Sequence, residues 1–360
     1  MSNDPYRKLA TVLDTLPNGF PATDSGLEIK LLQKIFTPEE AELFCDLRLT
    51  METPVQIAER TGRPLEGLDE MLTSMWKEKG QIQGAELGPT RIFKLLPWVI
   101  GVWEMQIGRM DEEFAKLSEE YYAHFGPQFF SKGPALMRSI PVGQDVTPTQ
   151  EAMPYDRVSG IIEKGQSFAV NDCVCRTEER ILGHNCESPL EVCLAIAPVP
   201  GLFEKQPWGR PISKEEAYGV IEKAEEAGLV HMTSNIENGH GFICNCCGCC
   251  CAVLKGINKL GLEDVVNTDH YSQIDAEDCT VCGLCGESVC QVDAISEGDD
   301  SFQVDRRLCI GCGVCLESCP VEAITLQPKP ESERIASPPD SDAWMDQRGA
   351  QRGVDFSTYK

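Results

Sequence analysis

Two cysteine-rich stretches near the C-terminus decide the fold of that region: CTVCGLCGESVC at 279–290 and CIGCGVCLESCP at 309–320. The second has the spacing C-x2-C-x2-C-x3-C-P, whereas the first has C-x2-C-x2-C-x4-C and continues with Gln291 instead of proline. A C-x2-C-x2-C run curls around a [4Fe–4S] cluster and provides three thiolate ligands, while a remote cysteine provides the fourth. Zinc also uses C-x2-C pairs, but eight cysteines in this order favour two [4Fe–4S] clusters.

The segments that follow the two blocks, VDAI at 292–295 and VEAI at 321–324, repeat one another. This duplication favours a pseudo-two-fold βαβ pair, and residues 266–328 resemble the bacterial-type two-cluster ferredoxins. In that family the fourth cysteine of each block serves the other cluster. The resemblance implies that one cluster is held by Cys279, Cys282, Cys285 and Cys319, and the second by Cys309, Cys312, Cys315 and Cys290. The extra residue and Gln291 depart from the family pattern and alter the turn that carries Cys290.

Ten further cysteines lie in the middle of the chain, six of them in the run CNCCGCCC at 244–251. These ten are Cys173, Cys175, Cys186, Cys193, Cys244, Cys246, Cys247, Cys249, Cys250 and Cys251. Neighbouring residues in the run point in different directions, so we expect it to divide between two sites or to keep some thiols free. We predict one or two further Fe–S clusters, completed by cysteines from 173–193. The alternative for Cys186 and Cys193 is that they are buried apolar side chains.

The total of 19 cysteines is odd, which argues against a disulfide framework. The N-terminus has no secretory or twin-arginine pattern, and the longest apolar stretch, near Ile92–Trp103, is too short and too interrupted to span a bilayer. We therefore expect a cytoplasmic protein, in a reducing compartment where clustered thiols usually serve metal or redox chemistry.

The formal net charge is −25. A chain this acidic repels nucleic acids and anionic membranes in general, and thiolate-bound clusters add further negative charge. Acidic electron carriers meet partners through complementary basic patches. We therefore expect redox proteins or oxidoreductase subunits as partners, and no nucleic acid.

Residues 1–130 are predicted to form a helical, winged-helix-like domain. Thr37-Pro38-Glu39-Glu40 is a helix start, 54–61 and 65–79 are two further helices, and two strand-like runs follow. DNA binding is one interpretation, and packing or protein contact is the other. Over residues 39–95 the 7 basic and 11 acidic side chains give a net charge of −4, which favours the second because a DNA reader needs a basic face.

The fold class is therefore α+β, with several domains. The winged-helix-like domain is followed by a cysteine-rich mixed domain at 131–265, the ferredoxin domain at 266–328 and a flexible tail at 329–360, with 134–154 as a linker or long loop. The whole chain also resembles poorly characterised 4Fe–4S-binding proteins of anaerobic bacteria and archaea. That resemblance rests on LPNGFPAT (16–23), CVCR (173–176), SPLEVCL (188–194) and ICNCCGCCC (243–251), among other segments.

These observations predict a multi-cluster electron-transfer protein, or an electron-transfer subunit of an anaerobic oxidoreductase complex. No catalytic residue is assigned, because the chain has neither a dinucleotide-binding G-x-G-x-x-G in a strand–helix unit nor a phosphate loop. Two alternatives stay open. One is a redox-sensing regulator that uses the winged-helix-like region, and the other is an enzyme whose middle cluster has an open iron site.

Overall fold

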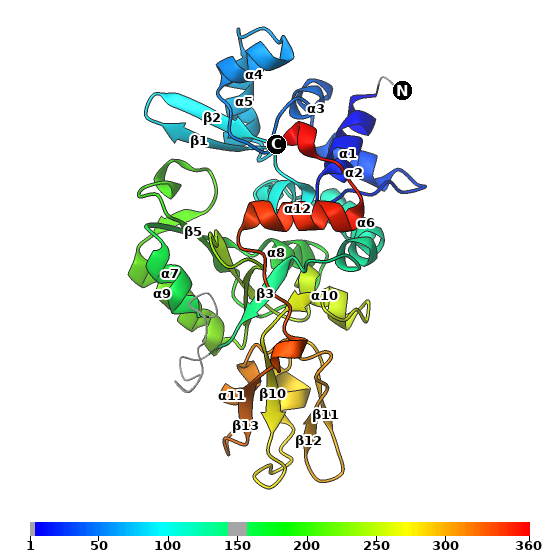
Figure 1. Ribbon diagram of the computed structural model, residues 1–360, viewed down its shortest axis with the longest axis vertical. Coiled ribbons are helices and arrows are strands. Elements are labelled where there is room, and N and C mark those ends of the chain that lie inside the picture. The colour runs from blue at the N-terminus through cyan, green and yellow to red at the C-terminus, as the bar shows by residue number, and fades with distance from the viewer. Residues whose placement is uncertain (1–3, 143–156) are drawn as a thin grey trace.

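The computed structural model of the chain describes residues 4–142 and 157–360. It is a mixed α+β structure that is elongated along one axis, as Figure 1 shows. The N-terminal helices lie at one end, a large sheet lies in the middle, and the ferredoxin-like region lies at the opposite end. No helix among the described residues is long and apolar enough to cross a membrane. Most of the linker expected at 134–154 falls outside the described residues, although Met137–Ile140 forms strand β3.

The N-terminal part contains the three helices and the hairpin that the sequence predicts, and two further helices that precede them. The helices are α1 (Pro5–Thr15), α2 (Leu27–Ile35), α3 (Pro38–Phe44), α4 (Pro54–Thr61) and α5 (Leu68–Lys77), and the antiparallel hairpin is formed by β1 (Gln83–Leu87) and β2 (Thr90–Lys94). The hydroxyl groups of Thr37 and Thr53 cap α3 and α4 in capping boxes, which satisfy the free N–H groups of a first turn. Gly62 ends α4 with a φ of 74°, where a side chain would be strained.

The middle of the molecule is a seven-stranded sheet in the order β6-β4-β5-β8-β7-β3-β9. Its strands are β3 (Met137–Ile140), β4 (Ser167–Asp172), β5 (Glu191–Ala197), β6 (Arg210–Ile212), β7 (Val230–Ser234), β8 (Phe242–Cys246) and β9 (Val266–Asn267). Neighbouring strands are antiparallel except β3 and β9, which are parallel. Helices α7 (Val158–Lys164) and α9 (Lys214–Glu226) share an apolar core with β4, β5 and β8.

Three helices join the N-terminal part to the sheet: α6 (Glu112–Phe130), α8 (Val174–Ile181) and α10 (Ala252–Asn258). Helix α6 contacts both α8 and α10. Its aromatic side chains Tyr121, Phe125 and Phe129 are buried in the N-terminal core, and the Tyr122 hydroxyl donates to the carbonyl of Ala252 in α10 (2.6 Å). Helices α8 and α10, which belong to cysteine-bearing segments of the middle region, therefore pack against the N-terminal part through α6.

The ferredoxin-like region consists of two small antiparallel pairs with the cysteines between them. Strand β10 (His270–Ile274) pairs with β13 (Ile324–Pro328), and β11 (Ile295–Glu297) pairs with β12 (Phe302–Val304). One helical turn, α11 (Val314–Glu317), carries Cys315, the third cysteine of the second block. The apolar core here is formed around the side chains of Ile295, Phe302 and Ile324 together with Cys285 and Cys315.

The expectation of a flexible tail at 329–360 is corrected by the structure. Residues Ser341–Arg352 form helix α12, which lies across the molecule beside α6 (Figure 1). The Trp344 indole donates to the carbonyl of Ala135 (2.9 Å), and the buried Arg348 guanidinium donates to the carbonyl of Phe129 in α6. Arg352 pairs with Asp14 of α1 (2.8 Å). These few long-range anchors hold a segment whose composition is that of a disordered tail.

Candidate metal centres

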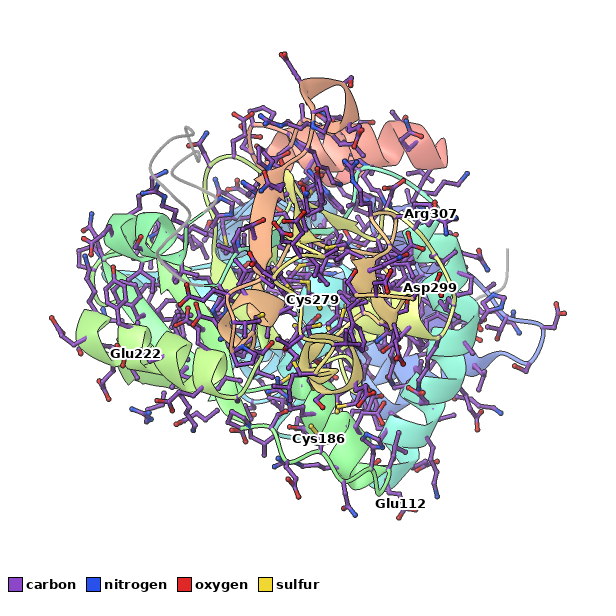
Figure 2. The ribbon with its side chains drawn as sticks, turned by 90° about the horizontal axis from the view of Figure 1, so that it is seen from below. Glu112, Cys186, Glu222, Cys279, Asp299 and Arg307 are labelled. Atoms are coloured by element: carbon purple, nitrogen blue, oxygen red, sulfur yellow. The ribbon has the colours of Figure 1, made fainter. Side chains whose placement is uncertain are left out.

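The structure brings the cysteines at 279–319 together in two groups that each draw from both blocks. Cys279, Cys282, Cys285 and Cys319 line one small pocket of about 20 Å³. Ile274, Phe302 and Ile324 complete its apolar wall. This grouping is the one that the resemblance to two-cluster ferredoxins implies. Figure 2, seen from the ferredoxin-like end, shows Cys279 near the centre of the view.

The second group contains Cys290 and the first three cysteines of the other block. Burial raises the pKa of the Cys312 thiol, and the neighbouring sulfurs of Cys315, Cys309 and Cys290 raise it further. The pKa of Cys315 is likewise raised to about 12, mainly by burial. A thiol with so high a pKa stays protonated unless a cation stabilises the thiolate, which is what binding to a metal does.

Backbone N–H groups point at the sulfurs of both groups. The N–H of Ala294 donates to Cys290 Sγ (3.2 Å), and that of Ala323 donates to Cys319 Sγ (3.3 Å). These are the alanines of the repeated VDAI and VEAI segments. The repeat therefore provides the fourth cysteine of each block with the same hydrogen bond, of the kind that tunes a cluster's reduction potential.

The extra residue of the first block is accommodated as a π-helical turn. Over Cys285–Val289 the chain is π-helical, and the N–H of Cys290 donates to the carbonyl of Cys285 five residues earlier (3.1 Å). In the second block the N–H of Cys319 donates to Leu316 three residues earlier (3.2 Å). Single π turns are typical insertions at functional sites. The insertion thus keeps Cys290 at its group instead of displacing it.

Gln291, which replaces the proline of the family pattern, ties the first block to the CNCCGCCC loop. Its Oε1 accepts a hydrogen bond from the N–H of Gly248 (2.7 Å), and its Nε2 donates to the carbonyl of Gly228 (3.1 Å). A Cβ at Gly248 would collide with the Gln291 carbonyl oxygen, so glycine allows the two segments to approach closely. Proline could make neither of the two side-chain hydrogen bonds.

Four of the middle cysteines form a compact group, which we call the four-thiol set: Cys186, Cys247, Cys249 and Cys250. Their sulfur atoms all lie within 4.8 Å of one another. Cys186 lies 3.9 Å from Cys247 and 3.7 Å from Cys249, measured between sulfurs. Such convergence of four sulfurs is the geometry of a metal centre. It also places Cys186 in this group rather than apart in the apolar core.

The other six middle cysteines form a second group, the six-thiol set: Cys173, Cys175, Cys193, Cys244, Cys246 and Cys251. Their thiols are linked by hydrogen bonds in the order 173–175–251–246–244–193. The pKa of Cys244 is lowered to about 5 because the thiols of Cys193 and Cys246 donate to it. Cys193 therefore has neighbouring sulfurs, unlike the isolated apolar cysteine considered above.

Arg176 lies between the two sets and is fully buried. Its Nε donates to Cys247 Sγ (3.3 Å), and its two terminal nitrogens donate to the carbonyls of Pro189 and Asn245. Burial opposes the charge, but the sulfurs of Cys173 and Cys247 outweigh that effect and raise the pKa of the guanidinium. In turn the pKa of Cys247 is lowered to about 4, first by a hydrogen bond from Cys250 and also by the Arg176 charge. Arg176 therefore donates a hydrogen bond to a sulfur of the four-thiol set.

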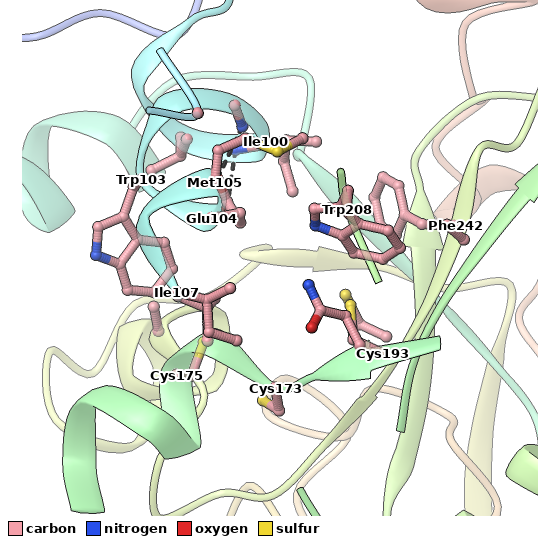
Figure 3. A pocket seen from close by; sticks show the side chains of 18 of the residues that line it. Ile100, Trp103, Glu104, Met105, Ile107, Cys173, Cys175, Cys193, Trp208 and Phe242 are labelled. Atoms are coloured by element: carbon pink, nitrogen blue, oxygen red, sulfur yellow. Dashed lines mark hydrogen bonds between the residues drawn. The ribbon is translucent and has the colours of Figure 1, made fainter. Parts of the chain in front are cut away.

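One residue at the six-thiol set was not anticipated from the sequence. Glu104 lies half-buried beside it and accepts hydrogen bonds from the N–H groups of Ile100 (2.9 Å) and Gly101 (2.7 Å), as Figure 3 shows. Burial is the largest cause that raises the pKa of Glu104 to about 7. In the sequence, Glu104 is a single acidic residue directly after the aromatic stretch Trp98–Trp103. Such residues are too common to carry a prediction.

Comparison with known proteins supports the assignment of one block. Residues 302–325 match the model of a 4Fe–4S binding domain, a segment that contains Cys309, Cys312, Cys315 and Cys319. A search of curated proteins finds no match. The chain therefore carries a 4Fe–4S binding motif. The ligand roles of the remaining cysteines, and the whole-chain resemblance to proteins of anaerobes, stay predictions.

Proposed function

We propose that this protein is a multi-cluster iron–sulfur protein that passes single electrons between redox partners. When bound, each [4Fe–4S] cluster accepts and releases one electron at a time. The fit of the residues to such clusters is good at the ferredoxin-like region, where two groups of four sulfurs each receive a backbone N–H donor. The four-thiol and six-thiol sets add two further groups of sulfur donors.

The observation that carries this proposal is the continuity between the sets. Cys290, Cys309 and Cys312 pack against the same apolar core as Cys246 and Cys251 of the six-thiol set. Gln291, next to Cys290, hydrogen-bonds to Gly248, which lies between Cys247 and Cys249 of the four-thiol set. A protein that stored iron or sensed oxidant at one site would not need its thiol groups joined in this way. A relay for electrons does need it.

The metal content of protein prepared without oxygen tests the proposal. We expect at least about eight iron atoms and eight acid-labile sulfides per chain, because two four-iron clusters require that number. Substitution of Cys312 by alanine should lower both counts by about four. Cys45, which belongs to none of the sets and is buried in the N-terminal core, is the matched control, and Cys45→Ala should leave both counts unchanged. Iron at background level in the intact chain would contradict the proposal.

Zinc must be counted in the same samples, since it distinguishes clusters from single ions at the four-thiol set. Four sulfurs around one tetrahedral zinc lie about 3.8 Å apart, given a Zn–S distance of about 2.3 Å, and the spacing from Cys186 is close to this. We expect iron with sulfide there and no zinc. One zinc per chain that is lost in Cys249→Ala would restrict the relay to the other sets.

We infer further that the partners are redox proteins with a basic face. With a net charge of −25, the chain attracts such a face over a distance set by the ionic strength. The rate of electron exchange with a basic redox protein should therefore fall as salt is added, whereas exchange with an acidic one should be slow at low salt. Equal rates of electron exchange with the basic and the acidic redox protein at low salt would contradict this part of the proposal.

A further inference from the structure

A cavity of about 730 Å³ lies against the six-thiol set. This volume is in the range of sites for small organic molecules. It far exceeds the pocket of about 20 Å³ among Cys279, Cys282, Cys285 and Cys319, where the sequence also predicts a cluster. Enclosing a cluster does not by itself account for so much space.

The walls of the cavity are largely aromatic. Trp103 and Met105 lie on one side, with Ile107 between Trp103 and the thiol of Cys175, and Trp208 and Phe242 lie on the other side, as Figure 3 shows. Further aromatic side chains complete the lining: Trp76, Trp98, Tyr121, Tyr122, Phe203 and others. Aromatic rings that face a cavity from several elements favour a planar aromatic occupant, since offset and edge-to-face contacts add to the burial of apolar area.

The remaining wall is formed by the thiols. All six cysteines of the six-thiol set line the cavity. Cys173, Cys175 and Cys193 face it in Figure 3. A molecule in the cavity would therefore lie against whatever these sulfurs bind.

One carboxyl oxygen in the lining of the cavity has no hydrogen-bond partner in the described part of the chain. Glu178 lines the cavity and is only 6% exposed, and its Oε1 has no hydrogen-bond partner within the described part of the chain. Buried carboxyl oxygens without a partner are rare in folded proteins, because the lost hydrogen bonds to water are not replaced. A bound molecule with a hydroxyl or amino group would supply the missing donor.

The wall near Glu104 is held in place at a conformational cost. Ile100 has a φ of 51°, which is unfavourable for a β-branched residue. The Glu104 carboxylate accepts hydrogen bonds from the N–H groups of Ile100 and Gly101 and thereby holds this turn. Strained backbone of this kind concentrates at ligand sites. The cavity also reaches the surface, because the exposed Lys77, Gly108 and Arg109 belong to its lining.

We propose that this cavity binds a planar aromatic small molecule that carries a hydrogen-bond donor and holds it against the six-thiol set. Binding itself depends only on the cavity. The proximity of the molecule to a cluster rests on the function proposed above.

The probe for the test is 2-naphthol, and its saturated analogue decahydro-2-naphthol has the same hydroxyl group but no aromatic ring. Both are titrated into the full chain, prepared without oxygen, by calorimetry. We expect 2-naphthol to bind at least about tenfold more tightly, a ratio that corresponds to roughly 1.4 kcal/mol and is reachable by aromatic contacts. Absence of 2-naphthol binding up to its solubility limit, or equal affinity for both compounds, would overturn the proposal.

Two variants locate the binding. Ile107→Trp fills the cavity and should abolish 2-naphthol binding, whereas the matched Ile335→Trp, at a side chain that is 53% exposed outside the lining, should leave it unchanged. Trp208→Ala removes an aromatic wall and should weaken binding about tenfold. Circular dichroism identifies any variant that fails to fold, and unchanged binding in both folded cavity variants would refute this site. Iron counted in the same samples separates the two proposals: full iron without binding contradicts this one, and binding without iron contradicts the other.

Discussion

The ferredoxin-like region and the middle region both gather cysteines, but they do so in different ways. In the first, each group of four combines three cysteines from one short turn with one from the other block, and the space among them is small. In the second, the cysteines come from β4–α8, β5 and the 244–251 run, and the six-thiol set borders a cavity of about 730 Å³. The first region therefore encloses little space between its thiols. The second is assembled from segments that are distant in the sequence, and it borders a cavity large enough for a small organic molecule.

The division of the 244–251 run follows from the backbone that carries it. Cys244 and Cys246 are two residues apart on strand β8, so their side chains lie on the same face and join the six-thiol set. The chain then turns, and Cys247, Cys249 and Cys250 meet Cys186. Cys251 begins helix α10 and returns to the six-thiol set. A strand, a turn and the start of a helix thus divide the six cysteines of this run between the four-thiol set and the six-thiol set.

We expect the largest effect from removal of the positive charge of Arg176, which lies between the four-thiol set and the six-thiol set. Arg176→Met leaves Cys247 and two buried carbonyls without their donor, and loss of one partner from a buried charged group costs about 3–5 kcal/mol. We expect middle-region iron to be lost and the thermal midpoint to fall, while the spin-resonance signals of the ferredoxin-like clusters persist. Arg210→Met, at a side chain that is 54% exposed, is the control and should behave as the parent protein. Retention of all iron in Arg176→Met would show that the two sets do not depend on this cation.

Next in size is the pH dependence of stability that Glu178 of helix α8 contributes. Burial raises the pKa of Glu178 to about 7, although a hydrogen bond with Ser118 lowers it. The folded state therefore keeps a proton that the unfolded state loses above about 4.5, so stability falls as pH rises through about 7. Between pH 5.5 and 8 the fall amounts to about 2 kcal/mol. Glu178→Gln should remove that share of the pH dependence of the unfolding midpoint. An identical pH profile in the variant and the parent would contradict this assignment.

Much of the ferredoxin-like region was predictable because its ligands follow local spacing. The turn of each C-x2-C-x2-C run and the repeated VDAI and VEAI segments could be anticipated from residues within a few positions of one another. The cross-block grouping was implied by the resemblance to two-cluster ferredoxins. The partition of the ten middle cysteines could not, because it depends on which strand carries Cys193 and where the loop with Cys186 lies. Helix α12 was missed for the same reason: its segment is polar, and it is ordered by contacts from Trp344 and Arg348 to residues more than two hundred positions away.

The smallest effect concerns the junction between the two regions. Gln291→Leu removes the hydrogen bonds to Gly248 and Gly228, at an expected cost of about 1–2 kcal/mol. Iron content should stay unchanged, but electrons supplied to the ferredoxin-like clusters should reach the middle sets more slowly, as followed by freeze-quench spin resonance. Gln273→Leu, at an exposed strand position, controls for the loss of a glutamine. Equal transfer rates in the two variants would mean that Gln291 serves only to hold the structure together.

The most direct test of the account is the iron that remains when the ferredoxin-like region is disabled. In a Cys282→Ala, Cys312→Ala double variant prepared without oxygen, we predict that iron and acid-labile sulfide persist in the middle region, at about four of each or more per chain. This remainder should disappear when Cys244 and Cys249 are also replaced by alanine. A folded double variant with iron at background level would contradict the account, because the middle thiols would then bind no cluster.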